Sequence, residues 1–355
     1  MSASRLAIKR SLQRKPGHTR FPLQRTMGVA IVLALATVAA ACGSSSTPSA
    51  AKPDKVTVVL DWTPNTNHSG IYLARAKGWY RKAGLNVNVV EPGDTPSLEI
   101  LGAGKADVAI SVQEELVPAR AKGLPVVSIG AVIQHNTSSL VSLRSAGIAT
   151  PGDLPGHTYG GFGGLLEKAL IKKFATCGGG DPSKIRFVDV GNADYRIGLQ
   201  RHQYDVVWIF DGWDGIRLAA VDKLSVHRIP FLAHTDCIPD WYTPLVATSE
   251  KMIHARPGVL KRFMVATSHG YQAAMRDPAA AADALMSAAP ELDRNLVERS
   301  ARYLATRYAD EPAKWGHQDR HIWTRFVSFL HDAGLIDAPI DVGKAYTNRF
   351  LPGNG

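Results

Sequence analysis

The chain has 355 residues and a formal net charge of +10, a value typical of proteins that bind nucleic acid or anionic surfaces. The charge is unevenly distributed, because residues 1–41 hold seven basic residues and no acidic one. Residues 42–355 keep 34 basic and 31 acidic groups, a net charge of +3 that argues against a nucleic-acid-binding protein. Their ordinary globular composition and length suit two domains of about 100–200 residues.

The N-terminal segment has the pattern of a signal peptide. Arg20 and Arg25 precede an apolar run at residues 28–40, and three alanines, residues 39–41, end it. The run is shorter than the roughly 20 apolar residues of a membrane span. Cys42 follows at the position of a lipoprotein cysteine, although Ala39 stands where leucine is usual.

We therefore predict a signal peptide at residues 1–41, lipidation of Cys42 and a flexible tether at residues 42–54. These features place the protein on the extracytoplasmic face of the cell membrane, held there by its lipid anchor. The alternative is that Cys42 lies by chance beside an ordinary cleavage site.

Two further cysteines, Cys177 and Cys237, can pair in an oxidising compartment or remain two buried thiols, and the sequence leaves both possibilities open. The twelve histidines are scattered, with a single pair at His-x-x-x-His spacing, His317 and His321, and no Cys-x-x-Cys spacing occurs. This pattern predicts no metal site.

Strand and helix patterns alternate in the first region. The predicted strands are residues 55–60, 86–90, 106–111 and 126–132, and the predicted helices are residues 69–83, 97–103 and 113–122. This alternation predicts parallel sheets with helices on both faces.

A second region repeats the alternation. Its predicted strands are residues 157–160, 185–190, 206–210 and 225–229, with helices at 165–175 and 195–200. A strand at residues 244–249 follows, and then helices at 258–275, 278–289, 293–308 and 319–333 that we expect to pack on the first region.

These elements predict two α/β lobes. Lobe 1 comprises residues 55–148 and 245–355, lobe 2 comprises residues 149–244, and the chain crosses near residues 146–156 and 236–246. Because ligands of open α/β sheets sit at the carboxyl ends of the strands, the residues after each strand are the binding candidates.

The loop after the first strand combines a large aromatic residue with several polar side chains, Trp62, Asn65, Asn67 and His68. An indole can stack on a flat heterocycle while amides read the mixed donors and acceptors of its edge. The alternative is structural: Asn67 or Ser69 caps the next helix and Trp62 lies in the core.

Two further loops offer candidates. Gln113 and Glu114 stand at a helix start, where an acid also gains from the helix dipole. Gly161 and Phe162 lie in a glycine-rich turn that admits a ligand close to backbone amides, or that serves only as a tight turn. The turn lacks the Gly-Lys-Ser/Thr ending of a phosphate loop.

The run at residues 206–216 ends a strand among aromatic and acidic residues, with Trp208, Phe210, Trp213 and Asp214 as candidates. A carboxylate beside stacking rings can accept hydrogen bonds from an exocyclic amine, although Asp214 can also serve only as an acid at a helix start. The sequence shows no arrangement of nucleophile and base, and we predict neither catalysis nor a cofactor.

Four segments carry a family resemblance: residues 60–87 (LDWTPNTNHSGIYLARAKGWYRKAGLNV), 104–130 (GKADVAISVQEELVPARAKGLPVVSIG), 205–216 (DVVWIFDGWDGI) and 345–352 (AYTNRFLP). They resemble the thiamine-pyrimidine precursor proteins. That family contains lipoproteins that bind formylaminopyrimidine or related compounds for ABC importers, and also pyrimidine synthases. The resemblance covers nearly all of residues 55–352.

The resemblance implies a type II periplasmic-binding-protein fold, an α/β fold of two lobes with a hinge and an interlobe cleft. It also implies that residues 62–68 and the Trp213-Asp214 motif line a pyrimidine site. Many importer members carry glutamate where this chain has Asp214, so the ligand is expected to differ or to sit closer.

The synthase branch is expected to need a lysine that holds pyridoxal phosphate and a histidine four residues later, and this chain has Ser111 and Glu115 there. It also keeps only Cys237 of an iron-binding cysteine motif expected at residues 237–243.

We therefore expect a small heterocyclic ligand, an ABC permease and ATPase as partners, and a function in thiamine-precursor uptake. The alternatives are riboflavin, a sulfonate or nitrate-like anion held by Arg196 or Arg217, and pyrimidine synthesis.

Overall fold

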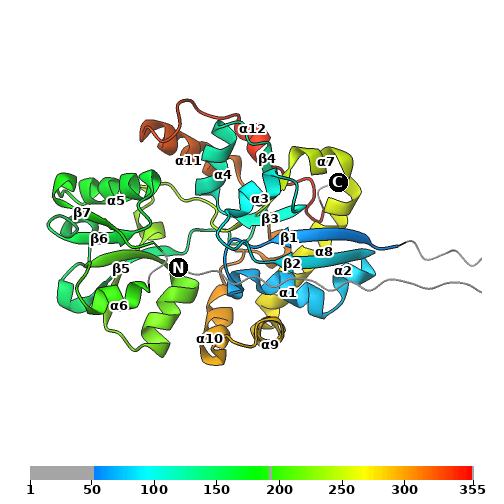
Figure 1. Cartoon of the computed structure of the whole chain (residues 1–355), viewed down its shortest axis with the longest axis horizontal. Helices are drawn as coiled ribbons and strands as arrows, with labels where there is room; N and C mark the ends of the chain where they lie inside the picture. The colour runs from blue at the N-terminus through cyan, green and yellow to red at the C-terminus, as the bar shows by residue number, and fades with distance from the viewer. Residues whose placement is uncertain (1–51, 192–193, 354–355) are drawn as a thin grey trace, which may run out of the picture. The chain divides into compact units, whose positions relative to one another are not determined.

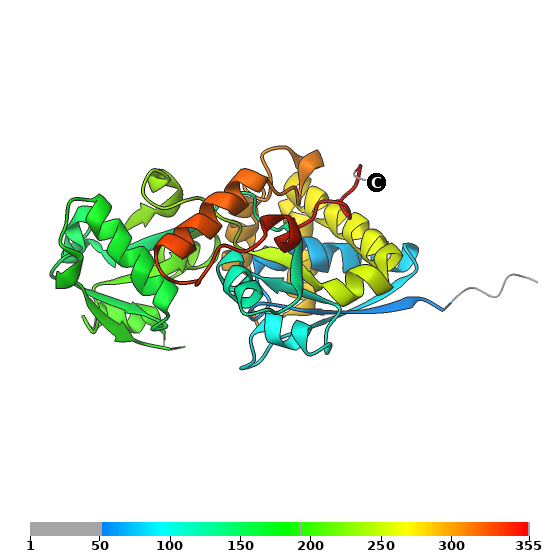
Figure 2. The same cartoon turned by 90° about the horizontal axis from the view of Figure 1, so that it is seen from above.

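The computed structural model describes residues 52–191 and 194–353 of the chain. The predicted signal peptide, Cys42 and most of the predicted tether lie outside the described residues. The described part contains two five-stranded sheets with helices around them, which Figures 1 and 2 show in two views.

The first sheet has the strand order β2-β1-β3-β10-β4. Its strands are β1 (Asp54–Val59), β2 (Leu85–Val90), β3 (Val108–Ser111), β4 (Val126–Ala131) and β10 (Leu245–Ser249). Strand β1 pairs in parallel with β2 and β3, whereas β10 runs antiparallel to both β3 and β4. The predicted strands are present, but the sheet is mixed rather than parallel.

The second sheet has the order β7-β6-β8-β5-β9, again with one strand running against its neighbours. Its strands are β5 (Ser138–Leu143), β6 (Thr158–Gly161), β7 (Arg186–Asp189), β8 (Val206–Phe210) and β9 (Val226–Pro230). Strand β6 pairs in parallel with β7 and β8, and β5 is antiparallel to β8 and β9.

Strand β5 corrects the predicted crossing. The sequence analysis assigned no strand to this segment and placed the first crossing near residues 146–156, whereas β5 already belongs to the second sheet. The first crossing therefore lies between β4 and β5, and the second lies between β9 and β10. We accordingly propose that lobe 2 begins ahead of β5 rather than at residue 149.

The two antiparallel strands, β5 and β10, are each the first strand after a crossing between the sheets. Strand β5 follows the crossing out of β4, and its first residue, Ser138, lies opposite Phe210 at the end of β8. Strand β10 follows the crossing out of β9, and its first residue, Leu245, lies opposite Ser111 at the end of β3. Both crossings therefore join the carboxyl-end edges of the two sheets, and the loops after the parallel strands surround them.

The helices follow the predicted order, with boundaries shifted by a few residues. They are α1 (Ser69–Ala76), α2 (Trp79–Lys82), α3 (Ser97–Gly102), α4 (Gln113–Ala121), α5 (Leu165–Cys177), α6 (Tyr195–Gln200), α7 (Glu250–Ala255), α8 (Pro257–Arg276), α9 (Pro278–Ala288), α10 (Arg294–Leu304), α11 (Arg320–Asp332) and α12 (Val342–Ala345). The helix predicted at residues 69–83 is divided into α1 and α2 because Gly78 between them has a φ of +70°.

Short helical turns fill several loops. They are η1 (Thr66–His68), η2 (Arg144–Ala146), η3 (Pro151–Asp153), η4 (Pro182–Lys184), η5 (Asp211–Gly215), η6 (Arg217–Val221), η7 (Phe231–His234) and η8 (Pro312–Lys314). Of these, η5 and η6 are wide, π-type turns. The helix expected after Asp214 is thus present as a continuous, largely π-type segment, residues 211–221, which begins ahead of Asp214.

Local sequence explains where the late helices begin. Asp277, Asp293 and Asp319 each precede a helix and accept a hydrogen bond from a backbone N–H of its first turn, at 3.0, 2.7 and 2.6 Å. Pro257 and Pro278 occupy first helical positions, where the missing N–H has no cost.

The tail helices pack on the first region, as predicted. Helices α8, α9 and α10 share an apolar cluster with β1 and α1. A second cluster contains Trp323 and Phe326 of α11 together with residues of both sheets. The cores of the two lobes are thus continuous through α11.

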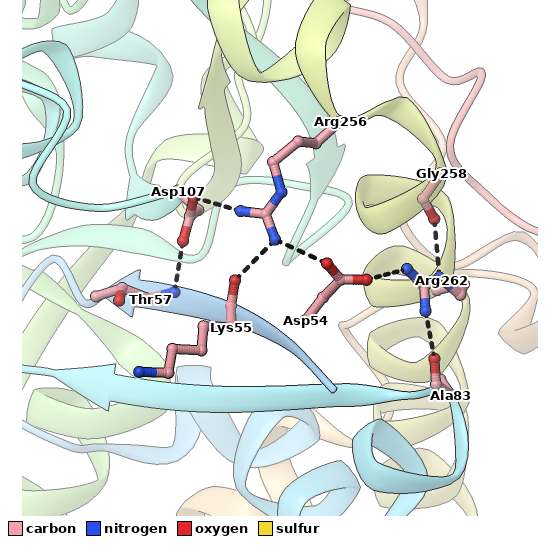
Figure 3. A network of polar contacts seen from close by, with 8 residues as sticks. All are labelled: Asp54, Lys55, Thr57, Ala83, Asp107, Arg256, Gly258 and Arg262. Atoms are coloured by element: carbon pink, nitrogen blue, oxygen red, sulfur yellow. Dashed lines mark hydrogen bonds and ion pairs between the residues drawn. The ribbon is translucent and has the colours of Figure 1, made fainter. Parts of the chain in front are cut away.

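A charged network lies at the other end of the first sheet, where β1 begins (Figure 3). Asp54 accepts hydrogen bonds from Arg262 at 2.6 Å and from Arg256 at 3.4 Å. Arg256 also reaches Asp107, whose second carboxylate oxygen accepts the Thr57 N–H. The network ties the start of β1 to α8 and to the residue before β3.

Candidate functional site

The candidate site lies where the loops after β1, β3, β6 and β8 surround the two crossings. Each of these loops follows the carboxyl end of a parallel strand, and the crossings fix those ends toward the opposite lobe. Every ligand-binding residue predicted from the sequence except Trp208 belongs to one of these strand ends.

The loop after β1 is shaped by its own side chains. Asn65 accepts a hydrogen bond from the Asn67 N–H at 2.9 Å and donates to the Thr63 carbonyl at 3.0 Å. His68 Nδ1 accepts the Asn65 N–H at 3.2 Å, so its Nε2 carries the proton that is donated to Asp61 at 2.7 Å. Asn65 and His68 therefore hold the loop in shape, whereas the structural alternative had named Asn67 or Ser69 as the cap and Trp62 as a core residue.

Trp62 and Asn67 remain the candidates in this loop to meet a ligand. The Trp62 side chain is 54% exposed, unusual for so large an aromatic residue. Asn67 is partly buried, and its backbone carbonyl accepts a hydrogen bond from the Tyr271 hydroxyl at 2.7 Å. That contact fixes the loop against α8.

The residues after β3 hold the second crossing. Gln113 accepts the Tyr242 N–H at 2.8 Å and donates its own N–H to the Tyr242 carbonyl at 3.0 Å. Glu114 accepts hydrogen bonds from Trp241 Nε1 at 2.9 Å and from the Thr243 hydroxyl at 3.2 Å. Both predicted residues thus bind residues 241–243 of the second crossing, a role that the sequence could not indicate.

Acidic groups at this strand end are held in a low-dielectric environment. Burial raises the pKa of Glu114 to about 8, although part of the residue remains exposed. Burial, together with the charge of Asp61, also raises the pKa of Glu115. The first lobe therefore presents carboxyl groups that gain from a donor or a cation.

The glycine-rich turn after β6 has a structural explanation. The Glu167 carboxylate lies beneath it and accepts hydrogen bonds from the Phe162 N–H at 2.9 Å and from the Tyr159 hydroxyl at 2.5 Å. A Cβ on Gly161 would lie 2.3 Å from that carboxylate, so a larger residue there would displace the Glu167 side chain. Phe162 itself is 65% exposed and projects from the end of the strand.

Two acidic residues of lobe 2, Asp211 and Asp214, follow the end of β8. Asp214 accepts hydrogen bonds from the Tyr195 hydroxyl at 2.9 Å and from the Phe210 N–H at 3.2 Å, and burial raises its pKa. Asp211 accepts from the Ser139 hydroxyl at 2.6 Å and pairs with Arg228 at 3.2 Å, and burial raises its pKa as well. Asp211 was not predicted from the sequence.

Aromatic residues adjoin these carboxylates. Trp208 packs against Phe231 and Trp241, with ring centroids 4.9 and 6.0 Å away. Trp213 lies partly buried against the apolar cluster of the first lobe, and Phe210 is partly buried at the strand end. Trp213 and Asp214 therefore follow the end of β8, and Trp208 lies in the middle of that strand.

Helix α10 connects the loop after β1 with the turn after β8. The Ser300 hydroxyl donates to the Gly212 carbonyl in η5 and is also hydrogen-bonded to the Thr66 hydroxyl in η1. A Cβ on Gly212 would lie 2.7 Å from Leu304 of the same helix. A serine within an amphipathic helix carries no sequence signal of such a bridge, so Ser300 was missed.

Cys177 and Cys237 form a disulfide with a Cα–Cα distance of 5.9 Å. It joins the end of α5 to the second crossing, two segments 60 residues apart in the chain. The pairing that the sequence left open is thus present in the structure.

Three further findings delimit the chemistry. Within residues 52–191 and 194–353, no group of three or more histidine, cysteine, aspartate or glutamate residues could hold a metal ion. No helix in this part of the chain is long and apolar enough to cross a membrane. A cavity of about 450 Å³ lies away from the predicted residues and is lined by Gln134, Asp310, Glu311, Ala313, Lys314, Trp315, His317, Leu351 and Pro352.

The fold is that of the periplasmic binding proteins. The alkanesulfonate-binding protein SsuA of Xanthomonas axonopodis pv. citri, solved with MOPS bound, superposes with a TM-score of 0.63 at 17% identity, covering 84% of this chain and 99% of the other. The chain belongs to the NMT1/THI5-like family, whose model matches residues 65–281.

Two relatives show the range of that family. The formylaminopyrimidine-binding protein of Halalkalibacterium halodurans is 25% identical over 326 residues, 87% of this chain and 94% of the relative. The 4-amino-5-hydroxymethyl-2-methylpyrimidine phosphate synthase of Legionella pneumophila is 27% identical over 300 residues, 84% of this chain and 92% of the relative.

Proposed function

We propose that this protein is the solute-binding lipoprotein of an ABC importer and that it captures an aminopyrimidine precursor of thiamine. The ligand would be of the formylaminopyrimidine or hydroxymethylpyrimidine type. Similarity to a formylaminopyrimidine-binding protein over 87% of the chain supports this proposal, as does the two-lobed fold. The two lobes would close on the solute by a hinge motion at the crossings.

The observation that carries the proposal is the abundance of carboxyl groups at the strand ends. Asp61 and Glu115 belong to the first lobe, and Asp211 and Asp214 to the second, and burial raises the pKa of the last three. Buried carboxyl groups favour a ligand that donates hydrogen bonds, such as an aromatic amine, and they repel anions.

The two arginines named for the anion alternative both lie beside Asp222, although Arg217 Nε has no hydrogen-bond partner among the described residues. Arg196 is held by Asp194 and by Asp222, the latter at 2.6 Å. Arg217 lies 3.7 Å from the Asp222 carboxylate. The sulfonate or nitrate alternative is thereby disfavoured, and riboflavin remains the competing heterocycle.

In this proposal Trp62, Trp213 and Phe162 wall the ring, and Asn67 and Asp214 read its edges. Asn65, His68, Gln113, Glu114, Gly161, Trp208 and Phe210 shape the loops around it. Each of these residues except Trp208 lies at one of the strand ends described above.

Synthase chemistry is the second candidate, because one relative of equal similarity is named as a synthase. At the positions where the synthase pattern expects the lysine and the donor histidine, Ser111 donates a hydrogen bond to Glu115 at 3.4 Å. Neither side chain can form an aldimine with pyridoxal phosphate. Pyridoxal-type absorbance or iron in the purified protein would favour the synthase.

The location is proposed from the N-terminal sequence and from the disulfide. Cys42 would carry the lipid anchor at the extracytoplasmic face, with a permease and an ATPase as partners. The Cys177–Cys237 disulfide is consistent with an oxidising compartment.

A ligand screen tests the proposal. The melting temperature of the exported domain is measured with formylaminopyrimidine, hydroxymethylpyrimidine, thiamine, riboflavin and an alkanesulfonate. A ligand at 100 times its Kd stabilises the folded state by about 2.7 kcal/mol, which is readily detected. We expect shifts with the aminopyrimidines alone, and a shift with riboflavin or the sulfonate alone would refute the assignment.

A further inference from the structure

Three buried side chains at the crossings carry polar atoms without a hydrogen-bond partner in the described structure. They are Gln113 Nε2, Asn136 Nδ2 and Ser138 Oγ. Their side chains are almost completely buried, with exposures of 0, 2 and 1%. A buried donor left unpaired costs about 1–3 kcal/mol, so three in one region require an explanation.

Two of the three residues contact one short segment of the second crossing, and the third, Ser138, is bonded to one of these two. Gln113 is bonded to Tyr242 through both its backbone and its side chain. Two residues earlier in that segment, Asp240 accepts the Asn136 N–H at 2.9 Å, and Asn136 Oδ1 accepts the Ser138 N–H at 2.6 Å. Each amide therefore uses its oxygen to build the hinge and keeps its NH₂ group unused.

The same place adjoins the end of β8. Ser138 lies opposite Phe210 in the β5–β8 ladder, and the next residue along β8, Asp211, donates its N–H to the Thr137 carbonyl at 2.9 Å. Trp208, whose indole N–H is also unpartnered, packs against Trp241. Unpartnered donors thus belong to residues of both lobes beside the two crossings.

We infer that Gln113, Asn136 and Ser138 form an acceptor-binding subsite at the hinge, where they donate hydrogen bonds to an uncharged carbonyl oxygen or ring nitrogen of the solute. This inference rests on the proposed function. The three donors are uncharged and the neighbouring Asp240 is paired with His135 at 2.6 Å, so an uncharged acceptor suits the subsite best. A hinge motion at the crossings would open the subsite to the solute.

The chemistry complements the carboxyl groups of the strand ends. Carboxylates such as Asp214 accept from the amine of a solute, and the hinge donors satisfy its acceptors. A solute that lacks an acceptor at this position would leave buried donors unpaired, and such a mismatch gives strong discrimination. Selectivity for a formylated over a deformylated pyrimidine would follow if the formyl oxygen occupies the subsite.

Calorimetric titration of single variants tests this inference, with formylaminopyrimidine and the same pyrimidine without its formyl group as probes. Gln113→Glu and Asn136→Asp keep the oxygens that build the hinge and remove the unused donors. Ser138→Ala removes a hydroxyl with almost no change in shape. The matched controls are Gln203→Glu and Asn88→Asp, which make the same changes at exposed positions.

We expect Kd for formylaminopyrimidine to rise about fivefold in Ser138→Ala and tenfold or more in the two acidic variants, with the controls within twofold of the native protein. Loss of discrimination between the two probes would identify the formyl oxygen as the occupant. The melting temperature of unliganded Ser138→Ala should equal or exceed that of the native protein, because an unpartnered hydroxyl is removed.

If Gln113→Glu or Asn136→Asp fails to fold, the Ser138→Ala variant alone tests whether the subsite binds the solute. A native protein that binds the probes together with a Ser138→Ala variant that binds within twofold overturns the subsite and leaves the proposed function intact. A drop in the unliganded melting temperature of Ser138→Ala would show that the hydroxyl has a structural partner, and this too overturns the subsite. A native protein that binds neither probe refutes the proposed function and the subsite with it.

Discussion

Asp214 accepts hydrogen bonds from the Tyr195 hydroxyl and the Phe210 N–H, and these contacts fix its carboxylate at the end of β8. An amine that donates to this carboxylate would lose its acceptor in Asp214→Asn, where an NH₂ group can face it instead. We expect the affinity for an amine-bearing pyrimidine to fall by at least tenfold, since hydrogen bonds to charged groups are worth about 1.5–3 kcal/mol.

The measurement is calorimetric titration, and Asp337→Asn, at an exposed position, serves as the matched control. The loss of affinity in Asp214→Asn should be confined to ligands that carry an amine. Equal affinity of the native protein and Asp214→Asn for every amine-bearing ligand would remove Asp214 from the site.

Glu114 makes the stability of the fold depend on pH. Burial raises its pKa to about 8, from an ordinary value of 4.5, so the folded chain retains a proton that the unfolded chain releases. Its stabilising contribution is complete below pH 4.5 and is lost as the pH rises to 8, with a slope of at most about 1.4 kcal/mol per pH unit. Glu114→Gln cannot titrate and should flatten this slope.

Denaturant unfolding at pH 5, 6, 7 and 8 measures the slope, and comparison with Glu99→Gln, an exposed acid, isolates the contribution of Glu114. An unchanged slope in Glu114→Gln would show that the carboxyl group titrates normally.

Residue types at strand ends could be predicted from sequence, but their partners could not. The polar and aromatic residues of the Trp62 and Trp213 loops reach the expected strand ends. The internal bonding of Asn65 and His68, by contrast, depends on the conformation of the loop. Ser300 and Asn136 reach the same region through tertiary contacts with segments more than 80 residues away, and a local pattern contains no information on such contacts.

Helices α1 and α8 pack so closely that two glycines are required. A Cβ on Gly270 would lie 2.0 Å from the Gly70 carbonyl oxygen, which is rigid backbone. Gly70 itself faces the Tyr271 ring, at 2.3 Å from its own hypothetical Cβ. Gly70, which follows the loop after β1, thus serves the packing of α1 against α8 rather than ligand binding.

We expect Gly270→Ala to destabilise the fold by at least about 2 kcal/mol, because overpacking against backbone forces α1 and α8 apart. Gly258→Ala is the matched control in the same helix, where a Cβ meets open space, and it should be neutral or stabilise by about 0.5 kcal/mol. Denaturant unfolding distinguishes the two variants. Equal stabilities would show that the helices can separate at little cost.

Two features of the sheets could not be predicted from local sequence, the presence of strand β5 and the antiparallel direction of strand β10. Strand β5 has the sequence SSLVSL, and five of its six residues are buried, so no alternation of polar and apolar residues marks it. Two of its three serines are satisfied by tertiary partners, Ser139 by Asp211 and Ser142 by the Ile148 carbonyl. Strand β10 was predicted, but its antiparallel direction follows from the crossing and is not encoded locally.

At the scale of the whole molecule, the two ends of β1 have different environments. The loop of Trp62 follows its carboxyl end, whereas Asp54 at its start belongs to the network with Arg256 and Arg262 (Figure 3). Asp54, the last residue of the predicted tether, therefore lies at the end of the first sheet opposite the candidate site.

Anchoring and binding should consequently be separable. In Cys42→Ser the predicted lipidation site is lost, and we expect the protein to move from the membrane fraction to the soluble extracytoplasmic fraction, with its Kd for the solute within twofold of the native value. Solute uptake by cells should nevertheless fall, because a tether keeps the binding protein at a high effective concentration near the permease. Ser44→Ala, two residues along the tether, is the control and should remain in the membrane fraction. Fractionation, mass spectrometry of the mature N-terminus and an uptake assay give the three readouts, and a Cys42→Ser protein that stays with the membrane would show that something other than Cys42 anchors it.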